Sequence, residues 1–325
     1  LPQHLSPELD ALDAQSSRDF LRQYSSPTLE SLLNSYSLSS MGGTLDETNA
    51  YCLLNFYGSE FGDAFGLPRY TFRGGLHEFA DIIARPIPAE VMLDGHIVFH
   101  VENTADGVSL LCIDDQDQIM QIKAKAAVVA IQKFAVPFLV AGLPDAQTEA
   151  MKQLHYSPFA TIHLCSNRAL LPRNDFDTWA LDTGEYFTDI LNPSSLYPDD
   201  AKGFVHTLYS PRPISDRGML MSDELFADFS RKAAEAALPM LGGAQAAEAI
   251  QEIHCWAWGH SIVRAGVGTH NGLAQRASQP FGNIFFANTD NDASPAVENA
   301  VAHGARAAEL IYKRLHAAVK GESVR

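Results

Sequence analysis

The sequence predicts a mixed α/β protein, and three observations support this fold class. A continuous apolar run at 126–131 has the pattern of a strand buried on both faces. Short alternating runs before it, separated by polar turns, have the pattern of a β-meander. Near the end of the chain, an apolar strand at 283–287 precedes a polar loop and a long helical stripe. Strands that alternate with helices in this way favour an α/β architecture.

The first part of the chain is expected to be helical. Residues 6–57 carry apolar side chains at helical spacing, with a capped turn beginning at Ser16. A second buried helix is predicted over 50–57, ended by Gly58 and Gly62. The apolar positions within 76–83 then share one face of a short helix.

Strands dominate the middle of the chain. Alternation and turn residues predict strands at 97–101, 108–113, 119–123, 160–164 and 203–209. An apolar face over 225–237 predicts a helix that stops at Pro239, because proline removes a helical hydrogen bond. In the final helix, Ser294 is expected as N-cap and Pro295 as the first helical residue.

Composition limits the classes of function. The 325 residues are 46% hydrophobic and 19% charged, typical of a globular chain with room for two domains. There are 23 Lys and Arg against 39 Asp and Glu, a net charge of −16, which disfavours nucleic acid and anionic membranes as partners. The acidic balance is compatible with a cationic substrate.

Cysteine usage and hydropathy indicate the compartment. Four cysteines without paired spacing indicate free thiols in a reducing environment, with no disulfide framework and no metal site. The most apolar stretch, 126–142, is interrupted and too short for a membrane span. We therefore expect a cytoplasmic protein. The chain begins with Leu1 instead of Met, so a periplasmic location stays open if a signal has been removed.

Two segments carry candidate chemistry. Within 254–260, Trp256 and Trp258 project to one face of a strand and form either an aromatic wall or core packing at a domain junction. His254 and His260 lie six residues apart, which does not favour a metal. In the other segment, a helix N-terminus follows the loop that carries Asp290. Such a helix N-terminus suits an anion or a carbonyl that becomes anionic. An ordinary strand–loop–helix junction would have the same pattern.

These residues give the chain a resemblance to a known family. The order Phe72-x-Gly-Gly-Leu76, a short helix, a meander and the run 125–131 is similar to the flavin-containing amine oxidase superfamily. So is the ending, in which Gly282-Asn-Ile-Phe-Phe-Ala-Asn-Thr-Asp290 precedes Val297-Glu-Asn-Ala-Val-x-x-Gly304-x-Arg-Ala-Ala308. That superfamily includes monoamine and polyamine oxidases, spermidine-dehydrogenase-like proteins and phytoene-desaturase relatives. The resemblance extends from about residue 15 to the end.

The resemblance implies a site for FAD. Val98 matches a position whose backbone contacts adenine, and Asn288 stands where the family usually has Gly. Asp290 matches the acidic residue that binds the ribityl chain, and Val297 matches the residue whose N–H meets the flavin O2 edge. The cofactor-binding residues implied are Gly74, Gly75, Val98, Asn288, Asp290, Pro295 and Val297. On the substrate side, Trp258 and His260 are the expected catalytic-pocket residues.

Two family features are not found in these 325 residues. No Gly-x-Gly-x-x-Gly turn that would hold the FAD pyrophosphate occurs, and no lysine matches the one that many amine oxidases place near flavin N5. The chain therefore resembles the C-terminal portion of such a protein, as a fragment, a processed chain or one subunit of a split enzyme. Its expected partner is the missing N-terminal FAD-binding segment or a chain that supplies it.

The resemblance also implies domains and an activity. The FAD-binding part is expected at 69–144 and 266–325, and the substrate part at 1–68 and 145–265. The activity implied is hydride removal from an amine C–N bond to FAD. Two alternatives remain: a desaturase or isomerase of the same superfamily, and a non-catalytic interaction or maturation subunit that binds no flavin alone.

Overall fold

The computed structural model describes residues 6–24, 26–61, 72, 75–172, 175–181, 186–197 and 201–320. It contains two compact units, each built from separate stretches of the chain. Unit 1 comprises 1–14, 87–155 and 267–325, and unit 2 comprises 15–86 and 156–266. The unit boundaries differ from those of the predicted domains, since helix α5 (Leu76–Ala84) falls in unit 2. The assignment of cofactor and substrate binding to the two parts stays a prediction.

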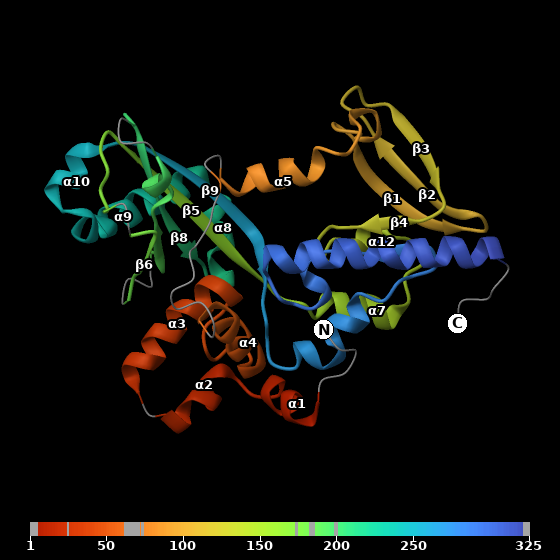
Figure 1. Cartoon of the computed structure of the whole chain (residues 1–325), viewed down its shortest axis with the longest axis horizontal. Coiled ribbons are helices and arrows are strands. Elements are labelled where there is room, and N and C mark those ends of the chain that lie inside the picture. The colour runs from red at the N-terminus through yellow and green to blue at the C-terminus, as the bar shows by residue number, and fades with distance from the viewer. Residues whose placement is uncertain are drawn as a thin grey trace. The chain divides into compact units, whose positions relative to one another are not determined.

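Unit 2 is organised around a five-stranded antiparallel sheet (Figure 1). Its strands, in spatial order, are β6 (Asp177–Trp179), β7 (Asp189–Leu191), β8 (Phe204–Pro211), β5 (Tyr156–Ser166) and β9 (Ile250–Val263). Helix α9 (Asp223–Leu241) packs against β5 and β9. Ile162 and Leu208 from the sheet and Ala233 from α9 are fully buried in the resulting core. One face of the sheet is therefore closed by a helix.

The helices of unit 2 confirm most of the expected helical start. Helices α2 (Ser17–Leu21), α3 (Pro27–Met41) and α4 (Ala50–Phe61) form there. Ser16 caps α2 as predicted, since its Oγ accepts a hydrogen bond from Asp19 N at 3.0 Å. Gly42 ends α3 with φ of 75°, and a Cβ at that position would lie 3.0 Å from Ile262. That glycine is required both by its conformation and by close packing.

Unit 1 combines a meander with a short parallel sheet. The predicted meander is confirmed as β1 (Ile97–Thr104), β2 (Gly107–Ile113) and β3 (Ile119–Ala124). Strand β4 (Ala127–Val129) pairs in parallel with β10 (Ile284–Phe286), so that the two predicted apolar strands lie side by side. The remaining helices of the two units are α1 (Pro7–Asp13), α6 (Val136–Leu139), α7 (Asp145–Lys152), α8 (Arg217–Leu220), α10 (Ala244–Ala249), α11 (Ala274–Ala277) and α12 (Val297–Lys320).

Two predicted helix boundaries are wrong, and a third is confirmed in part. Helix α4 continues through Gly58, because one glycine in a helix costs only about 1 kcal/mol, and ends at Phe61, directly before the predicted stop at Gly62. Helix α9 contains Pro239, which lies in the last turn, where one missing hydrogen bond is tolerated. Helix α12 begins at Val297, so Pro295 is not its first residue.

The start of α12 is displaced because the carbonyl of Ser294, which an N-cap would offer to the helix, is engaged elsewhere. It accepts from Ala296 N at 2.8 Å and from Asn299 Nδ2 at 3.0 Å. The first helical hydrogen bonds run instead to Ala296 O, from Asn299 N and Ala300 N. The Ser294 N–H donates to Asp292 Oδ1 at 3.2 Å and to Thr289 O at 3.3 Å, so the loop between β10 and α12 is a tight turn followed by a short link.

A buried carboxylate joins two distant segments of unit 1. Asp13, at the end of α1, is fully buried and accepts hydrogen bonds from His270 N at 3.2 Å and Asn271 N at 2.7 Å. Its Oδ1 also lies 3.3 Å from His270 Nδ1, and its backbone oxygen accepts from Gly268 N at 2.9 Å. These contacts fasten α1 to the turn Thr269–Leu273.

We expect Asp13→Asn to lower the free energy of unfolding by about 1.5–3 kcal/mol, the range for a hydrogen bond to a charged group. The substitution keeps the side-chain size but turns one acceptor into a donor that faces the Asn271 N–H. Urea denaturation measures the change, with Glu8→Gln on the exposed surface of α1 as matched control. Equal loss of stability in both variants would refute the role of Asp13.

Candidate flavin and substrate site

The loop after β10 is held by a buried lysine. Lys133 Nζ donates to Asn288 Oδ1 at 2.7 Å, and its backbone N–H donates to Asp290 Oδ2 at 2.9 Å. The ammonium also lies 5.4 Å from the ring centroid of Phe286. Lys133 is 0% and Asp290 2% exposed, whereas Asn288 is half-buried, so the cluster reaches the surface of unit 1 at Asn288. The structure therefore brings Asn288 and Asp290 together through a residue that the sequence did not single out.

Burial changes the acid–base behaviour of Lys133. Desolvation lowers its pKa from 10.5 to about 8, while the nearby Asp290 carboxylate acts in the opposite direction. Its signal in the sequence is faint: Lys133 is a charged residue two positions after a buried apolar run. Nothing local indicates that its partners lie 155 and 157 residues away.

The N-terminus of α12 provides a second element of the site. Val297, its first residue, is 50% exposed, so the start of this long helix is accessible. The first N–H groups of a helix have no partner within the helix and carry a partial positive charge. The link that includes Pro295 is held by Asn299 Nδ2, which donates to Ser294 O at 3.0 Å. An anion or a carbonyl oxygen can bind at this terminus.

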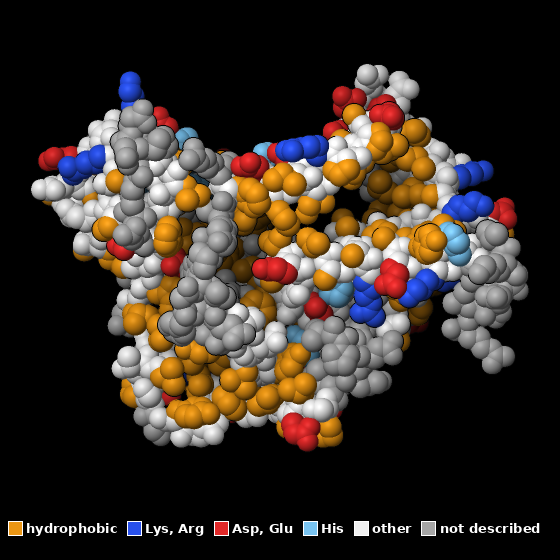
Figure 2. All heavy atoms as spheres, in the orientation of Figure 1, with side chains coloured by type: hydrophobic (Ala, Val, Ile, Leu, Met, Phe, Trp, Pro, Cys, Tyr) orange, Lys and Arg blue, Asp and Glu red, His pale blue; other side chains and the backbone are white. Residues whose placement is uncertain are grey.

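The edge of β4 opposite β10 is open. Among the residues that the structure describes, no strand pairs with it, and Val128 on β4 is 44% exposed. Val301 on α12 is 46% exposed, and Figure 2 shows apolar side chains at the surface over α12 and the meander. Parallel sheets are rarely exposed in this way, so this surface has the character of one that another segment covers.

The other predicted cofactor residues are spread over the two units. Val98 lies on β1 in unit 1, at a β-bulge between Val98 and His100, and is 38% exposed. Gly75 precedes α5 in unit 2 with φ of 84°, and no atom lies within 4 Å of where its Cβ would be. Gly74 lies outside the described residues. Their roles in cofactor binding stay predictions.

The two tryptophans lie on the side of the unit 2 sheet away from α9. Trp256 and Trp258 alternate along β9 with Cys255, which packs against the core. They are 51% and 46% exposed, so they are not core residues of unit 2, and their role as an aromatic pocket wall stays a prediction. On the neighbouring strand β5, the His163 ring contacts Trp256 edge-on, at a centroid distance of 5.1 Å.

Histidines extend this aromatic face. His163 Nδ1 lies 2.8 Å from Thr207 Oγ1, and burial, together with His254, lowers the His163 pKa. His254 stacks on Trp256 at a centroid distance of 6.2 Å. The face is therefore rich in rings, and burial favours the neutral form of His163. His163 and Thr207 are site candidates that the sequence analysis did not identify.

His260 lies two residues beyond Trp258 on the same strand. Partial burial and the nearby Arg217 lower the pKa of His260 from its ordinary value of 6.5. Arg217 Nε donates to Gly259 O at 2.7 Å, which fixes the guanidinium beside this segment. His260 is therefore neutral at pH 7 and can accept or donate one hydrogen bond. In the described part of the chain, no cluster of His, Cys, Asp and Glu could hold a metal ion.

This combination defines a class of protein: a two-part α/β fold with a parallel strand pair, a helix N-terminus at an acidic loop, and an aromatic-faced sheet. The family model for flavin-containing amine oxidoreductases matches residues 3–312, and the chain belongs to that family. A comparison with curated proteins found no match. None of the described helices is long and apolar enough to cross a membrane.

Solved structures agree on the fold. Cyclohexylamine oxidase from Brevibacterium oxydans has a TM-score of 0.71 at 18% identity, covering 97% of this chain and 71% of that one. A putrescine oxidase with two substitutions has a TM-score of 0.74 at 16% identity, covering 96% and 70%. The wild-type putrescine oxidase bound to putrescine has a TM-score of 0.73 at 16% identity, covering 94% and 70%. The chain therefore has the fold of flavin-dependent amine oxidases.

We expect the buried lysine to make stability depend on pH. Since the pKa of Lys133 falls from 10.5 to about 8 on folding, the unfolded chain binds more protons between these values. The free energy of unfolding should therefore rise with pH across that window, by up to about 3 kcal/mol. Denaturation curves from pH 7 to about 10.5 measure this rise. In Lys133→Met this rise of the free energy of unfolding with pH should vanish, whereas it should persist in the exposed control Lys123→Met. The same pH dependence of stability in wild type and Lys133→Met would contradict the prediction.

Proposed function

We propose that this chain is the flavin-ring and substrate portion of an FAD-dependent oxidoreductase that removes hydride from an amine. The observation that carries the proposal is the accessible N-terminus of α12, which follows the carboxyl end of β10 after the loop 287–296. Ligands of α/β proteins bind at the carboxyl ends of parallel strands, and helix N-termini favour developing negative charge. Membership of the flavin-containing amine oxidoreductase family supports the choice of cofactor.

The residues present fit an isoalloxazine ring and a ribityl chain. The backbone N–H at Val297 would stabilise negative charge on the ring edge beside it, with the helix dipole adding to the effect. Asp290 is the residue proposed to hold a ribityl hydroxyl, in a loop whose position Lys133 fixes. Bound FAD would supply the hydride acceptor, and the protein would supply orientation and electrostatics.

The pyrophosphate of FAD needs a further element. No Gly-x-Gly-x-x-Gly turn occurs in the 325 residues, and the open edge of β4 offers a place where another parallel strand can add. We propose that a nucleotide-binding strand–turn–helix, from another segment or a partner chain, covers this edge and completes the site. The absent motif is also the observation that favours the second candidate function, a non-catalytic interaction subunit without flavin of its own.

On the substrate side, the aromatic face of the unit 2 sheet is proposed to receive the amine. Ring faces attract a cation, but an amine must lose its proton before hydride can leave readily. Neutral His260 suits this task, because it can accept a hydrogen bond from the amine without stabilising an ammonium as a carboxylate would. Trp258 would contribute a wall of the pocket. Two solved structures of similar fold, a cyclohexylamine oxidase and a putrescine oxidase, support an amine as substrate.

The cofactor proposal is tested by flavin retention. The purified chain alone should retain no stoichiometric FAD, and adding a nucleotide-binding segment from a solved relative should restore a yellow complex. In that complex, Asp290→Ala should weaken FAD binding by about 1.5–3 kcal/mol. The exposed control Asp106→Ala should leave it unchanged.

Asp290→Ala also removes the carboxylate that lies near the buried Lys133 ammonium, which can destabilise the fold. The double variant Lys133→Met/Asp290→Ala removes that buried charge as well, so it separates loss of folding from loss of FAD binding. Equal FAD affinity in the wild type and in both Asp290 variants would refute the assignment of Asp290. Full flavin occupancy of the chain alone would refute the need for a further segment.

The substrate proposal is tested by anaerobic flavin reduction with primary amines, polyamines and amino acids. Trp258→Ala and His260→Asn should each slow bleaching at least about tenfold, while the exposed Gln251→Ala on β9 should not. The rate of flavin reduction in the wild type should fall on the acid side only below pH 6.5, because burial and Arg217 lower the His260 pKa. Bleaching by none of the amines would favour a desaturase or isomerase, and rates unchanged in both variants would remove these residues from the site.

A further inference from the structure

The two strands that carry the proposed amine site do not pair regularly where His260 lies. The register of β5 and β9 shifts around Pro158, so that residues 259–261 of β9 stand opposite this one residue. Such a bulge interrupts the ladder of backbone hydrogen bonds and changes the direction of the side chains within it. The proline adds to the interruption, because it has no N–H to donate. His260 therefore projects from the middle of a bulge and not from a regular strand.

Arg217 bridges the two strands at this bulge. It is half-buried and is the first residue of α8, which packs against β9 (Figure 1). Its Nε donates to Gly259 O on β9 at 2.7 Å, and its Nη2 donates to Tyr156 O on β5 at 2.5 Å. A guanidinium presents its donors in a rigid planar fork, so one side chain can hold two carbonyl groups in a fixed geometry. These two hydrogen bonds join the strands where their own ladder is interrupted.

Both residues that Arg217 holds are in direct contact with His260. Gly259 precedes it in the chain, so the bond to the Gly259 carbonyl fixes the peptide from which His260 follows. The His260 ring packs edge-on against the ring of Tyr156, at a centroid distance of 6.4 Å. One guanidinium therefore restrains both the backbone that bears the imidazole and the residue on which the imidazole rests.

The charge of Arg217 also acts on His260. The neighbouring carboxylate of Asp216 pairs with Arg212 at 2.6 Å, and in the described part of the chain no carboxylate pairs with Arg217. Burial is the larger cause of the lowered His260 pKa, and the positive charge of Arg217 adds to it. On β5, the titratable side chain that faces the ring is Tyr156. Hydrogen bonding and charge therefore come from the same side chain.

We propose that Arg217 is a positioning residue for the oxidation of the amine, which fixes the bulge and with it the direction in which His260 meets the substrate. This proposal rests on the proposed function, in which His260 accepts a hydrogen bond from the amine. Arg217 touches no reacting atom and acts through His260. Without its two hydrogen bonds, the bulge would have more than one accessible conformation, and the imidazole would be aligned for only part of the time.

NMR titration of the full chain tests this action without flavin or amine, with the His260 signal assigned by its loss in His260→Asn. Arg217→Gln should raise the His260 pKa, because it removes a positive charge. Arg217→Lys keeps the charge but lacks the planar fork, so the pKa should stay near that of wild type. In both variants, amide hydrogen exchange over 256–263 should become at least about tenfold faster. The exposed control Arg231→Gln on α9 should change neither quantity.

Rates of anaerobic flavin reduction test the positioning role. In the complex completed with a nucleotide-binding segment, Arg217→Gln and Arg217→Lys should each slow reduction by putrescine or cyclohexylamine about tenfold or more. When His260→Asn is already present, Arg217→Lys should slow it less than about twofold further, because the two residues act as one unit. Circular dichroism confirms that each variant is folded.

The outcomes separate this proposal from the proposed function. An unchanged His260 pKa in Arg217→Gln, or unchanged hydrogen exchange in both Arg217 variants, would overturn the proposal. So would losses of rate in Arg217→Lys and His260→Asn that multiply in full in the double variant. In these cases amines would still reduce the wild-type flavin. Failure of both amines to reduce the wild type would instead refute the proposed function, and the role of Arg217 in it.

Discussion

The parallel pairing of β4 with β10 is the constraint on which unit 1 depends. Each strand is only three residues long, yet together they align the turn after β4 with the loop before α12. The contacts of Lys133 with Asn288 and Asp290 form at that junction. Because the strand pair is so short, these side-chain contacts supplement its few backbone hydrogen bonds in holding the two segments together. The accessible end of α12 follows from the same alignment.

Local signals explain why much of the fold could be predicted from the sequence. The meander strands were predicted because alternation and turn residues lie within each strand and its neighbours. The same holds for the tryptophan face of β9, since the period of two is a property of the strand itself. Helix ends were less accessible to prediction: Ser294 has the right residue type for a cap, but its carbonyl accepts from Ala296 N and Asn299 Nδ2. That competition depends on three-dimensional structure.

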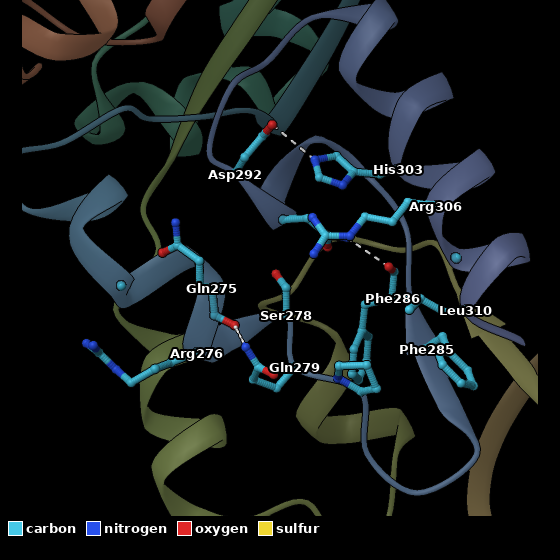
Figure 3. Close-up of a pocket in the computed structure, with 14 residues that line it drawn as sticks. Gln275, Arg276, Ser278, Gln279, Phe285, Phe286, Asp292, His303, Arg306 and Leu310 are labelled. Carbon is cyan, nitrogen blue, oxygen red and sulfur yellow. Dashed lines mark hydrogen bonds and ion pairs between the residues drawn. The ribbon is translucent and has the colours of Figure 1, made fainter. Parts of the chain in front are cut away.

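The candidate site was predictable to a lesser degree. Asp290 and Val297 were identified through family resemblance, but the burial of Asp290 and its contact with Lys133 join positions 157 residues apart. No local pattern contains that information. A cavity of about 640 Å³ between α11, β10 and α12 is a similar case, because its polar lining residues come from three separate segments (Figure 3). Short stretches of sequence show each residue but not its neighbours in space.

The segmented architecture has a consequence for how the protein is made. On the ribosome, both stretches of unit 2 have been synthesised before β10 emerges, so the antiparallel sheet of unit 2 can form first. Strand β4 is made long before β10 and must wait with its hydrogen-bonding edges exposed. Such contacts between distant residues form slowly, and an unpaired apolar strand is prone to self-association. During synthesis, unit 1 is therefore the part of the chain whose strands stay unpaired longest.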